Sequence, residues 1–128
     1  MDIEKVASEI VDSATKVHKA LGPGLLESAY QQCLIYELRQ RGLNTEFEVP
    51  MPIKYGEVKI DAGYRMDLVV NKMIVVENKT VEKLLPIHQA QILTYLKLSG
   101  YNLGFLLNWN VTIMKDGIKR IVNNLQQQ

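Results

Sequence analysis

The sequence contains a single cysteine, Cys33. One cysteine excludes an internal disulfide and a cysteine-rich zinc site, and it fits a reducing compartment. Because Cys33 lies in an apolar segment with helical spacing, we expect a buried thiol and not a nucleophile. The chain also lacks a long apolar run, a signal peptide and a lipidation motif. These absences predict a soluble, cytoplasmic protein that does not enter a membrane.

An excess of charge of one sign is missing as well. Fifteen Lys and Arg residues face fourteen Asp and Glu residues, which leaves a net charge of +1. The whole chain therefore lacks a strongly basic character, and any binding of nucleic acid must come from local patches. Apolar residues, in contrast, make up 47% of the 128 residues. This composition predicts one globular domain, residues 1–128, with a core of its own.

Two amphipathic helices are predicted at the start of the chain. Apolar residues recur at helical spacing over residues 3–21, and Gly22-Pro23-Gly24 then breaks the pattern. A second helix is expected from about residue 25 to residue 41, where Gly42 ends it. Its inner stripe includes Glu27, near the helix N-terminus. The helix dipole alone accounts for an isolated Glu there, whereas a functional hypothesis makes Glu27 a third acidic group at a site formed by later residues.

The rest of the chain predicts a sheet and one more helix. Residues 44–60 alternate with the period of a strand, but two prolines in this run indicate an edge strand, which leaves room for a homodimer. Residues 64–79 predict a hairpin of buried strands around Asn71-Lys72. Then follow a helix at residues 86–99, a strand parallel to the second hairpin strand at residues 101–107, and short closing strands at residues 111–114 and 118–122. This order predicts an α/β fold, in which α-helices flank a mixed β-sheet with an antiparallel meander.

The predicted hairpin carries three charged residues, Asp67, Glu77 and Lys79, within apolar strands. Removing a charge from water is costly unless the group is paired or binds a metal ion. Glu77 and Lys79 are two residues apart and therefore point to the same face of a strand. A two-residue turn at Asn71-Lys72 would pair Asp67 with Val76 and turn Asp67 to the other face. A metal site therefore predicts a three-residue loop or a bulge, and a buried ion-pair network is the structural alternative.

The third predicted helix carries a polar stripe beside an apolar one. The polar stripe consists of His88, Gln91 and Tyr95. The apolar stripe consists of Ile87, Ala90, Thr94 and Leu98. A polar stripe is usually the wet face of a helix, but apolar segments flank this helix on both sides. We therefore expect Gln91 and Tyr95 to be half buried and to face the hairpin.

Four short motifs, in this order, resemble those of a known family. Residues 24–30, GLLESAY, fit the pattern GxxExxY. Asp67 resembles the first part of the D…ExK motif, and Glu77-Asn78-Lys79, ten residues later, resembles its second part. Gln91 with Tyr95 resembles QxxxY. On these motifs, residues 21–123 are similar to the GxxExxY family within the PD-(D/E)XK nuclease superfamily. The resemblance implies a restriction-endonuclease-like core. Asn78 departs from the apolar residue expected in relatives, and we expect its polar side chain to loosen the packing behind the site.

The resemblance also implies a metal site. Asp67 and Glu77 would hold Mg²⁺ or Mn²⁺, with Lys79 as the catalytic lysine. Carboxylate oxygens are the ligands that hard divalent cations prefer, which makes Glu27 a candidate third ligand. On the third helix, the polar pair of the QxxxY motif would position the water or the scissile phosphate.

Two hypotheses of different classes follow. The first is a metal-dependent nuclease that hydrolyses phosphodiester bonds in nucleic acid, with DNA preferred over RNA and with Arg65 and Lys83 as phosphate contacts. The near-neutral charge then requires weak or structure-directed binding, a homodimer that joins basic surfaces, or a partner protein. The second is a non-catalytic module that binds nucleic acid or protein and keeps the nuclease-like fold. The joint presence of six candidate catalytic residues favours the enzyme: Glu27, Asp67, Glu77, Lys79, Gln91 and Tyr95.

Overall fold

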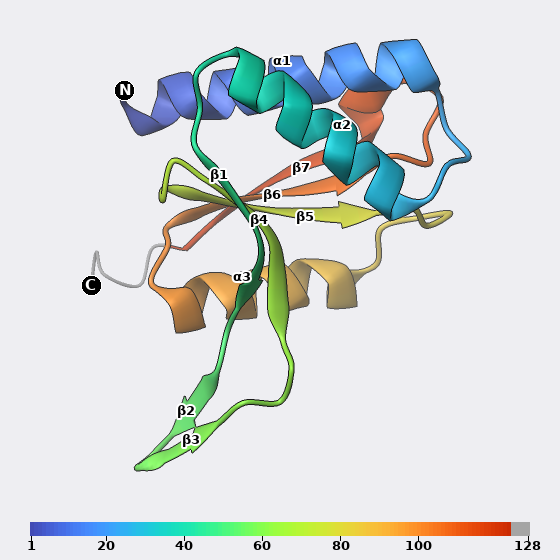
Figure 1. Cartoon of the computed structure of the whole chain (residues 1–128). Helices are drawn as coiled ribbons and strands as arrows, with labels where there is room; N and C mark the ends of the chain where they lie inside the picture. Colours follow the sequence, from blue (N-terminus) through green and yellow to red (C-terminus); the bar gives the residue numbers. More distant parts are fainter. Residues whose placement is uncertain (124–128) are drawn as a thin grey trace.

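The computed structural model describes residues 1–123, which form a sheet with helices on both faces (Figure 1). In chain order the elements are α1 (Ile3–Leu21), α2 (Glu27–Gln40), β1 (Thr45–Pro50), β2 (Ile53–Tyr55), β3 (Val58–Ile60), β4 (Arg65–Val70), β5 (Ile74–Lys79), α3 (Pro86–Ser99), β6 (Leu103–Asn108), the 3₁₀ helix η1 (Met114–Gly117) and β7 (Ile118–Val122). The five-stranded sheet has the order β1-β4-β5-β6-β7, so β1 is an edge strand as predicted. Its neighbouring strands are antiparallel except β5 and β6, which are parallel and joined through α3. The predicted α/β fold with a mixed sheet is confirmed.

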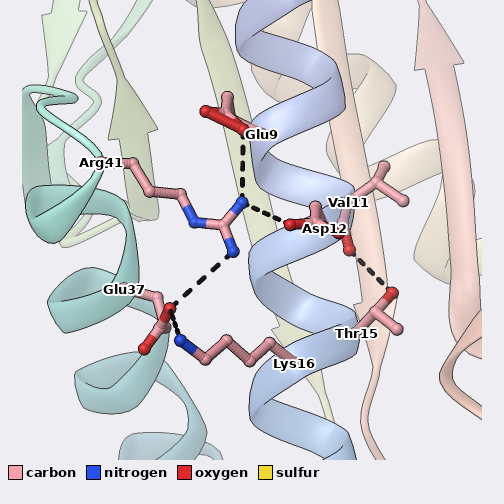
Figure 2. A network of polar contacts seen from close by, with 7 residues as sticks. All are labelled: Glu9, Val11, Asp12, Thr15, Lys16, Glu37 and Arg41. Atoms are coloured by element: carbon pink, nitrogen blue, oxygen red, sulfur yellow. Dashed lines mark hydrogen bonds and ion pairs between the residues drawn. The ribbon is translucent and has the colours of Figure 1, made fainter.

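Helices α1 and α2 pack side by side over one face of the sheet, and an arginine joins them on their outer side (Figure 2). Nη1 of Arg41 lies 3.2 Å from Oε1 of Glu9 and 2.6 Å from Oδ2 of Asp12, both on α1. Oε1 of Glu37 on α2 forms an ion pair with Nζ of Lys16 on α1, at 3.2 Å. The hydrogen bond to Asp12 is the main reason that the pKa of Arg41 is raised. Arg41 therefore ends the inner stripe of α2 at a helix–helix contact and not in the core.

The core has two parts, one on each face of the sheet. Between the sheet and the helices α1 and α2, apolar side chains such as Leu34 and Leu68 are fully buried. In the same layer, the ring of Tyr30 stacks on Trp109, with ring centroids 4.7 Å apart. On the other face, Leu96 of α3 packs with a smaller cluster. The sheet is therefore buried on both sides, which explains its long apolar runs.

Strands β2 and β3 form a separate antiparallel ribbon that projects beyond α3 (Figure 1). The ribbon divides the predicted meander, because β1 pairs directly with β4 and the ribbon is inserted between them. Pro50 and Pro52 have no backbone N–H, so the ladder cannot continue regularly past the end of β1. A last backbone hydrogen bond, from the N–H of Met51 to the carbonyl of Tyr64, joins the two chains at 3.0 Å before they diverge into the ribbon.

The prediction of a strand at residues 111–114 is wrong. These residues form bends that lead into η1, while β7 matches the second predicted closing strand. The carbonyl of Val111 is 2.8 Å from Nε2 of His18 on α1, so it pairs with a helix side chain and not with a strand. The chain then passes so close to β6 that a Cβ on Gly117 would lie 2.0 Å from the carbonyl oxygen of Asn108. These contacts bend the segment away from the sheet.

Helix α3 lies on the sheet with a different face from its predicted apolar stripe. Ile92 and Leu96 are fully buried, whereas Ile87 is 67% exposed and Leu98 is 42% exposed. The close approach depends on Gly104 of β6, because a Cβ there would lie 2.9 Å from Cδ1 of Ile92. None of the helices within residues 1–123 has both the length and the apolar character needed to span a membrane.

Candidate functional site

The hairpin of β4 and β5 has the odd loop that a metal site requires. Val70 pairs with Ile74, which leaves a loop of residues 71–73. Asn71 and Lys72 both have φ of +52°, a backbone conformation that non-glycine residues adopt uncommonly. One step further along the same register, Asp67 would stand opposite Glu77. The three-residue loop therefore brings the two carboxylates together.

Two hydrogen bonds between backbone N–H groups and carboxylates join Asp67 to strand β5, one at Glu77 and one at Asn78. The backbone N–H of Asp67 donates to Oε2 of Glu77 at 2.7 Å, and the backbone N–H of Asn78 donates to Oδ2 of Asp67 at 2.9 Å. Glu77 is 4% exposed. Within the described chain, the second oxygen of each carboxylate accepts no hydrogen bond from the protein. Those two oxygens are the donors that the pair can offer to a cation.

Strand β4 twists sharply at Asp67. Met66 packs in the cluster on the α3 side of the sheet, whereas Leu68 packs on the side of α1 and α2. Residues two apart on a regular strand point the same way, so the strand must turn between these two side chains. The neighbouring strand is irregular at the same level, because Glu48 has φ of +50° and is missing from the paired residues of β1 and β4. Asp67 therefore lies at the point where the side chains of β4 change the face of the sheet on which they pack.

On the α2 side, Asp67 lines an acidic cavity of about 260 Å³. Glu27 and Glu48 also line it, with Ser28, Gln31 and Asn78. Oε2 of Glu27 accepts hydrogen bonds from Thr80, from its backbone N–H at 3.2 Å and from its hydroxyl at 3.4 Å. Within residues 1–123, no group of three or more Asp, Glu, His or Cys side chains is arranged to hold one metal ion. Glu27 thus lies beside the carboxylate pair without forming a three-ligand cluster with it.

Burial makes the negative charge of the carboxylate pair unfavourable. It is the main reason that the pKa of Glu77 is raised to about 8, and the charge of Asp67 adds to this effect. Burial also raises the pKa of Asp67, followed by the charges of Glu48 and Glu27. None of Asp67, Glu77 and Lys79 forms an ion pair within the part of the chain that the structure describes. The described residues therefore do not form the buried network of ion pairs that was the structural alternative to a metal site.

Lys79 lies on the α3 side and is held by that helix. Its Nζ donates to Oε1 of Gln91 at 3.0 Å, and Nε2 of Gln91 is 3.2 Å from the hydroxyl of Tyr95. Tyr95 is buried, and its pKa is raised, first by burial and then by the charge of Glu77. The structure thus brings Lys79, Gln91 and Tyr95 together next to the carboxylates, as expected from the polar stripe.

The two predicted phosphate contacts lie apart from this cluster. Arg65 is exposed, donates to the carbonyl of Tyr64 at 2.9 Å, and has Oδ1 of Asp61 at 3.8 Å. Lys83 is exposed in the loop between β5 and α3. Neither residue lines the acidic cavity or contacts Asp67 or Glu77. Both residues stay predicted contacts for nucleic acid.

Asn78 has a different role from the one predicted. Its side chain is buried, accepts from Nε1 of Trp109 at 2.9 Å, and donates to Oε1 of Gln31 at 2.6 Å. Gln31 in turn donates to the backbone carbonyl of Asp67 at 3.1 Å. The polar side chain therefore fastens β5 to α2 and to the twist of β4, and the expectation that it loosens the packing is wrong. A polar residue within an apolar strand was the available signal for this role.

Glu48 is a residue of the site that the sequence did not single out. It lines the acidic cavity, and its charge raises the pKa of Asp67 more than the charge of Glu27 does. In the sequence it is one of two acidic residues, with Glu46, that alternate along an edge strand, so it carries no distinguishing signal.

The residues at the hairpin fit a hard divalent cation such as Mg²⁺ or Mn²⁺. Asp67 and Glu77 each present a carboxylate oxygen, the ligand type that these ions prefer. Both carboxylates have raised pKa values, and among residues 1–123 neither has a positively charged partner within hydrogen-bonding distance, so a cation would relieve the unfavourable burial of charge. Because the described residues form no three-ligand cluster, water or substrate oxygens would complete the coordination.

Comparisons with known proteins support the same assignment. Residues 4–121 match the PD-(D/E)XK nuclease superfamily, a span that runs from α1 into β7. Searches of curated proteins and of solved structures gave no significant match. The narrower GxxExxY family stays a prediction from the motifs. Since the match covers most of the chain, the protein belongs to the PD-(D/E)XK nuclease superfamily.

Proposed function

We propose that this protein is a metal-dependent nuclease that hydrolyses phosphodiester bonds in nucleic acid, with DNA as its substrate. One observation carries the proposal: the buried Glu77 accepts a hydrogen bond from Asp67 and has no cationic partner among the described residues, while Lys79 is held two residues away on the same strand. Membership of a nuclease superfamily supports this chemistry.

Asp67 and Glu77 are the residues proposed to hold Mg²⁺ or Mn²⁺, with Glu27 as a third, more distant carboxylate. When bound, such an ion lowers the pKa of a coordinated water and stabilises negative charge on a phosphate. The protein contributes a fixed pair of oxygens, because each carboxylate is already oriented by a backbone N–H at 2.7 Å or 2.9 Å. Such preorganisation reduces the rearrangement needed for binding.

Lys79 is proposed to stabilise the negative charge that develops on the phosphate. Gln91 accepts a hydrogen bond from one of the three N–H groups of the Lys79 ammonium and so orients it. The other two N–H groups stay available for a phosphate oxygen or the attacking water. The hydroxyl of Tyr95 accepts a hydrogen bond from Nε2 of Gln91 and so helps to orient this side chain. Arg65 and Lys83 are proposed to contact phosphates farther along the strand. A homodimer or a partner protein would add the basic surface that a net charge of +1 does not supply.

The direct test is cleavage of labelled single-stranded, double-stranded and branched DNA and RNA with Mg²⁺, Mn²⁺ or EDTA. We expect cleavage of DNA that requires the metal and is lost in Asp67→Asn and Lys79→Ala. Asp116→Asn and Lys19→Ala are matched controls, because both residues are exposed and lie outside the site. These two variants should cut like the wild type.

Two other results would reject the proposal in different ways. Cleavage that survives both site variants would indicate a contaminating enzyme. Binding of nucleic acid or of a protein, without cleavage in either metal, would instead identify a non-catalytic binding module.

A further inference from the structure

A groove of about 520 Å³ opens from the candidate site along α3. Lys79, Gln91 and Tyr95 line its inner end. Its walls come from the segment between β1 and β4, which contributes Tyr64, and from α3, which contributes Ile87 and Leu98. The volume lies within the range of sites that enclose a small organic ligand. The groove is thus continuous with the residues proposed to act on the phosphate.

The walls of this groove present apolar surface to water. Ile87 is 67% exposed, Tyr64 is 44% exposed and Leu98 is 42% exposed. The backbone of Tyr64 is fixed, because its carbonyl accepts from the N–H of Met51 at 3.0 Å and from Arg65 at 2.9 Å. A fixed backbone with an exposed aromatic ring is suited to stacking against a flat ligand.

The charges on the two sides of the hairpin differ. The groove along α3 is lined by Lys79 and contains no carboxylate among its lining residues. The cavity on the α2 side is lined by the carboxylates of Glu27, Glu48 and Asp67 and by no Lys or Arg. A polyanionic strand is repelled by the acidic side and attracted to the side of Lys79. The strand that is cut should therefore lie along α3.

We propose that the groove binds an unpaired nucleobase of the strand that is cut, stacked on Tyr64 and packed against Ile87 and Leu98. This inference rests on the proposed function for the position of the scissile phosphate, beside Lys79. Every nucleobase has an apolar face and stacks on aromatic side chains with little dependence on sequence. In a duplex, the same faces are covered by neighbouring base pairs. The groove therefore selects single-stranded nucleic acid or unpaired ends.

Binding without cleavage is the first measurement. A short fluorescein-labelled oligothymidylate and a blunt duplex of equal length are titrated with the protein, once in EDTA and once in Ca²⁺, and anisotropy is recorded. We expect tighter binding of the single strand. Tyr64→Ala should weaken it by about 5-fold or more, since stacking on an aromatic side chain contributes that much per base, and should leave duplex binding unchanged.

Matched controls separate the groove from general effects. Tyr55 is an exposed tyrosine on the ribbon that does not line the groove, so Tyr55→Ala should bind like the wild type. Ile87→Glu places a carboxylate in the groove and should weaken single-strand binding. Ile113→Glu places one on another surface of similar exposure, 61% against 67%, and should not. All four positions are exposed, so the variants should unfold at the temperature of the wild type.

Cleavage then distinguishes the two proposals. Single strands that lack one base, at successive positions, should be cut poorly when the missing base adjoins the scissile phosphate. In another outcome, cleavage is unchanged by the missing base, by Tyr64→Ala and by Ile87→Glu. This result would overturn the binding of a base in the groove and leave the proposed nuclease activity intact. Equal binding of single strand and duplex, or no binding of either, would also overturn the groove. Single-strand binding that depends on Tyr64, without any cleavage, would keep the groove and reject the nuclease.

Discussion

The backbone N–H of Asp67 donates to the carboxylate of Glu77 at 2.7 Å, so the two proposed metal ligands are in contact before any cation binds. Burial and the charge of Asp67 raise the pKa of Glu77 to about 8. The site therefore favours the binding of a positive charge. Among the described residues, no Lys, Arg or His forms an ion pair with either carboxylate. Proton uptake and metal binding must compete at Glu77.

The first prediction concerns stability without metal. Between pH 4.5, the ordinary pKa of Glu77, and about pH 8, its pKa in the folded protein, the folded state binds more protons than the unfolded state. Stability must then fall as pH rises across this window. In EDTA, we expect the unfolding temperature to drop by about 5 °C or more from pH 5 to pH 8. Thermal unfolding followed by circular dichroism measures it.

Glu77→Gln should remove most of this pH dependence, because the amide does not ionise. Glu57→Gln, at an exposed position in the β2–β3 turn, should keep it. Saturating Mg²⁺ or Mn²⁺ should stabilise the wild type most at pH 8, where the carboxylate is ready to bind, and should not stabilise Glu77→Gln as much. A wild-type profile that stays flat in EDTA would contradict the account of Glu77 as a buried, unpaired acid.

The second prediction concerns Asn78, whose side chain joins Trp109 and Gln31. Asn78→Leu leaves the buried N–H of Trp109 without an acceptor, which should cost about 1–3 kcal/mol of the free energy of unfolding. It should also weaken Mn²⁺ binding, because Gln31 no longer fixes the carbonyl of Asp67. Differential scanning calorimetry measures the stability, and isothermal titration calorimetry measures the affinity for Mn²⁺. Asn110→Leu is the exposed control and should change neither quantity; a stable Asn78→Leu variant with unchanged affinity would contradict the role of this network.

The sequence predicted the part of the site that depends on local periodicity. Glu77 and Lys79 had to share a face because a strand repeats every two residues, and Asp67 could join them only through an odd loop. The loop of residues 71–73 meets this condition. The edge position of β1 and the bounds of α3 were also predictable, because proline and glycine mark them directly.

Contacts between distant segments were not predictable from the same patterns. Asn78 bonds to side chains 31 and 47 residues away, and no periodicity identifies such partners. Glu48 lines the cavity with a positive φ on β1, and a Glu in a strand pattern does not predict such a backbone conformation. The bend at residues 111–113 has the same origin, since His18 of α1 takes the carbonyl of Val111. Tertiary contacts overrode the local preference in each case.

The third prediction separates the acidic residues of the α2 side. Glu27→Gln should weaken Mn²⁺ binding by about 10-fold, as expected when a carboxylate close to the metal is removed. Glu48→Gln should weaken it less, because the lost attraction to the cation is partly offset by a lower pKa of Asp67 once the charge of Glu48 is removed. Glu46→Gln is the control, since Glu46 lies on the same strand but does not line the cavity. Isothermal titration at one pH measures all three, and equal losses for Glu46 and Glu27 would contradict a local role for the cavity.

The fourth prediction ranks the residues that hold the ammonium group. Lys79→Ala should lower the single-turnover rate by about 10²–10³-fold, because it removes a charge aimed at the phosphate. Gln91→Leu keeps Lys79 but removes the acceptor that orients it at 3.0 Å, so the loss should be smaller. Tyr95→Phe removes only the hydroxyl behind Gln91 and should cost least. The rates are compared at saturating metal.

Metal affinity provides the check on this ranking. The charge of Lys79 lowers the pKa of Glu77, so Lys79→Ala should also weaken metal binding at neutral pH, whereas Tyr95→Phe should not. Raising the pH should recover the metal affinity of Lys79→Ala, because it ionises Glu77 without the lysine, but it should not recover the rate. If high pH restored both, Lys79 would act only by preparing the metal site. If Tyr95→Phe were slower than Lys79→Ala, the hydroxyl would act directly on the substrate and not through Gln91.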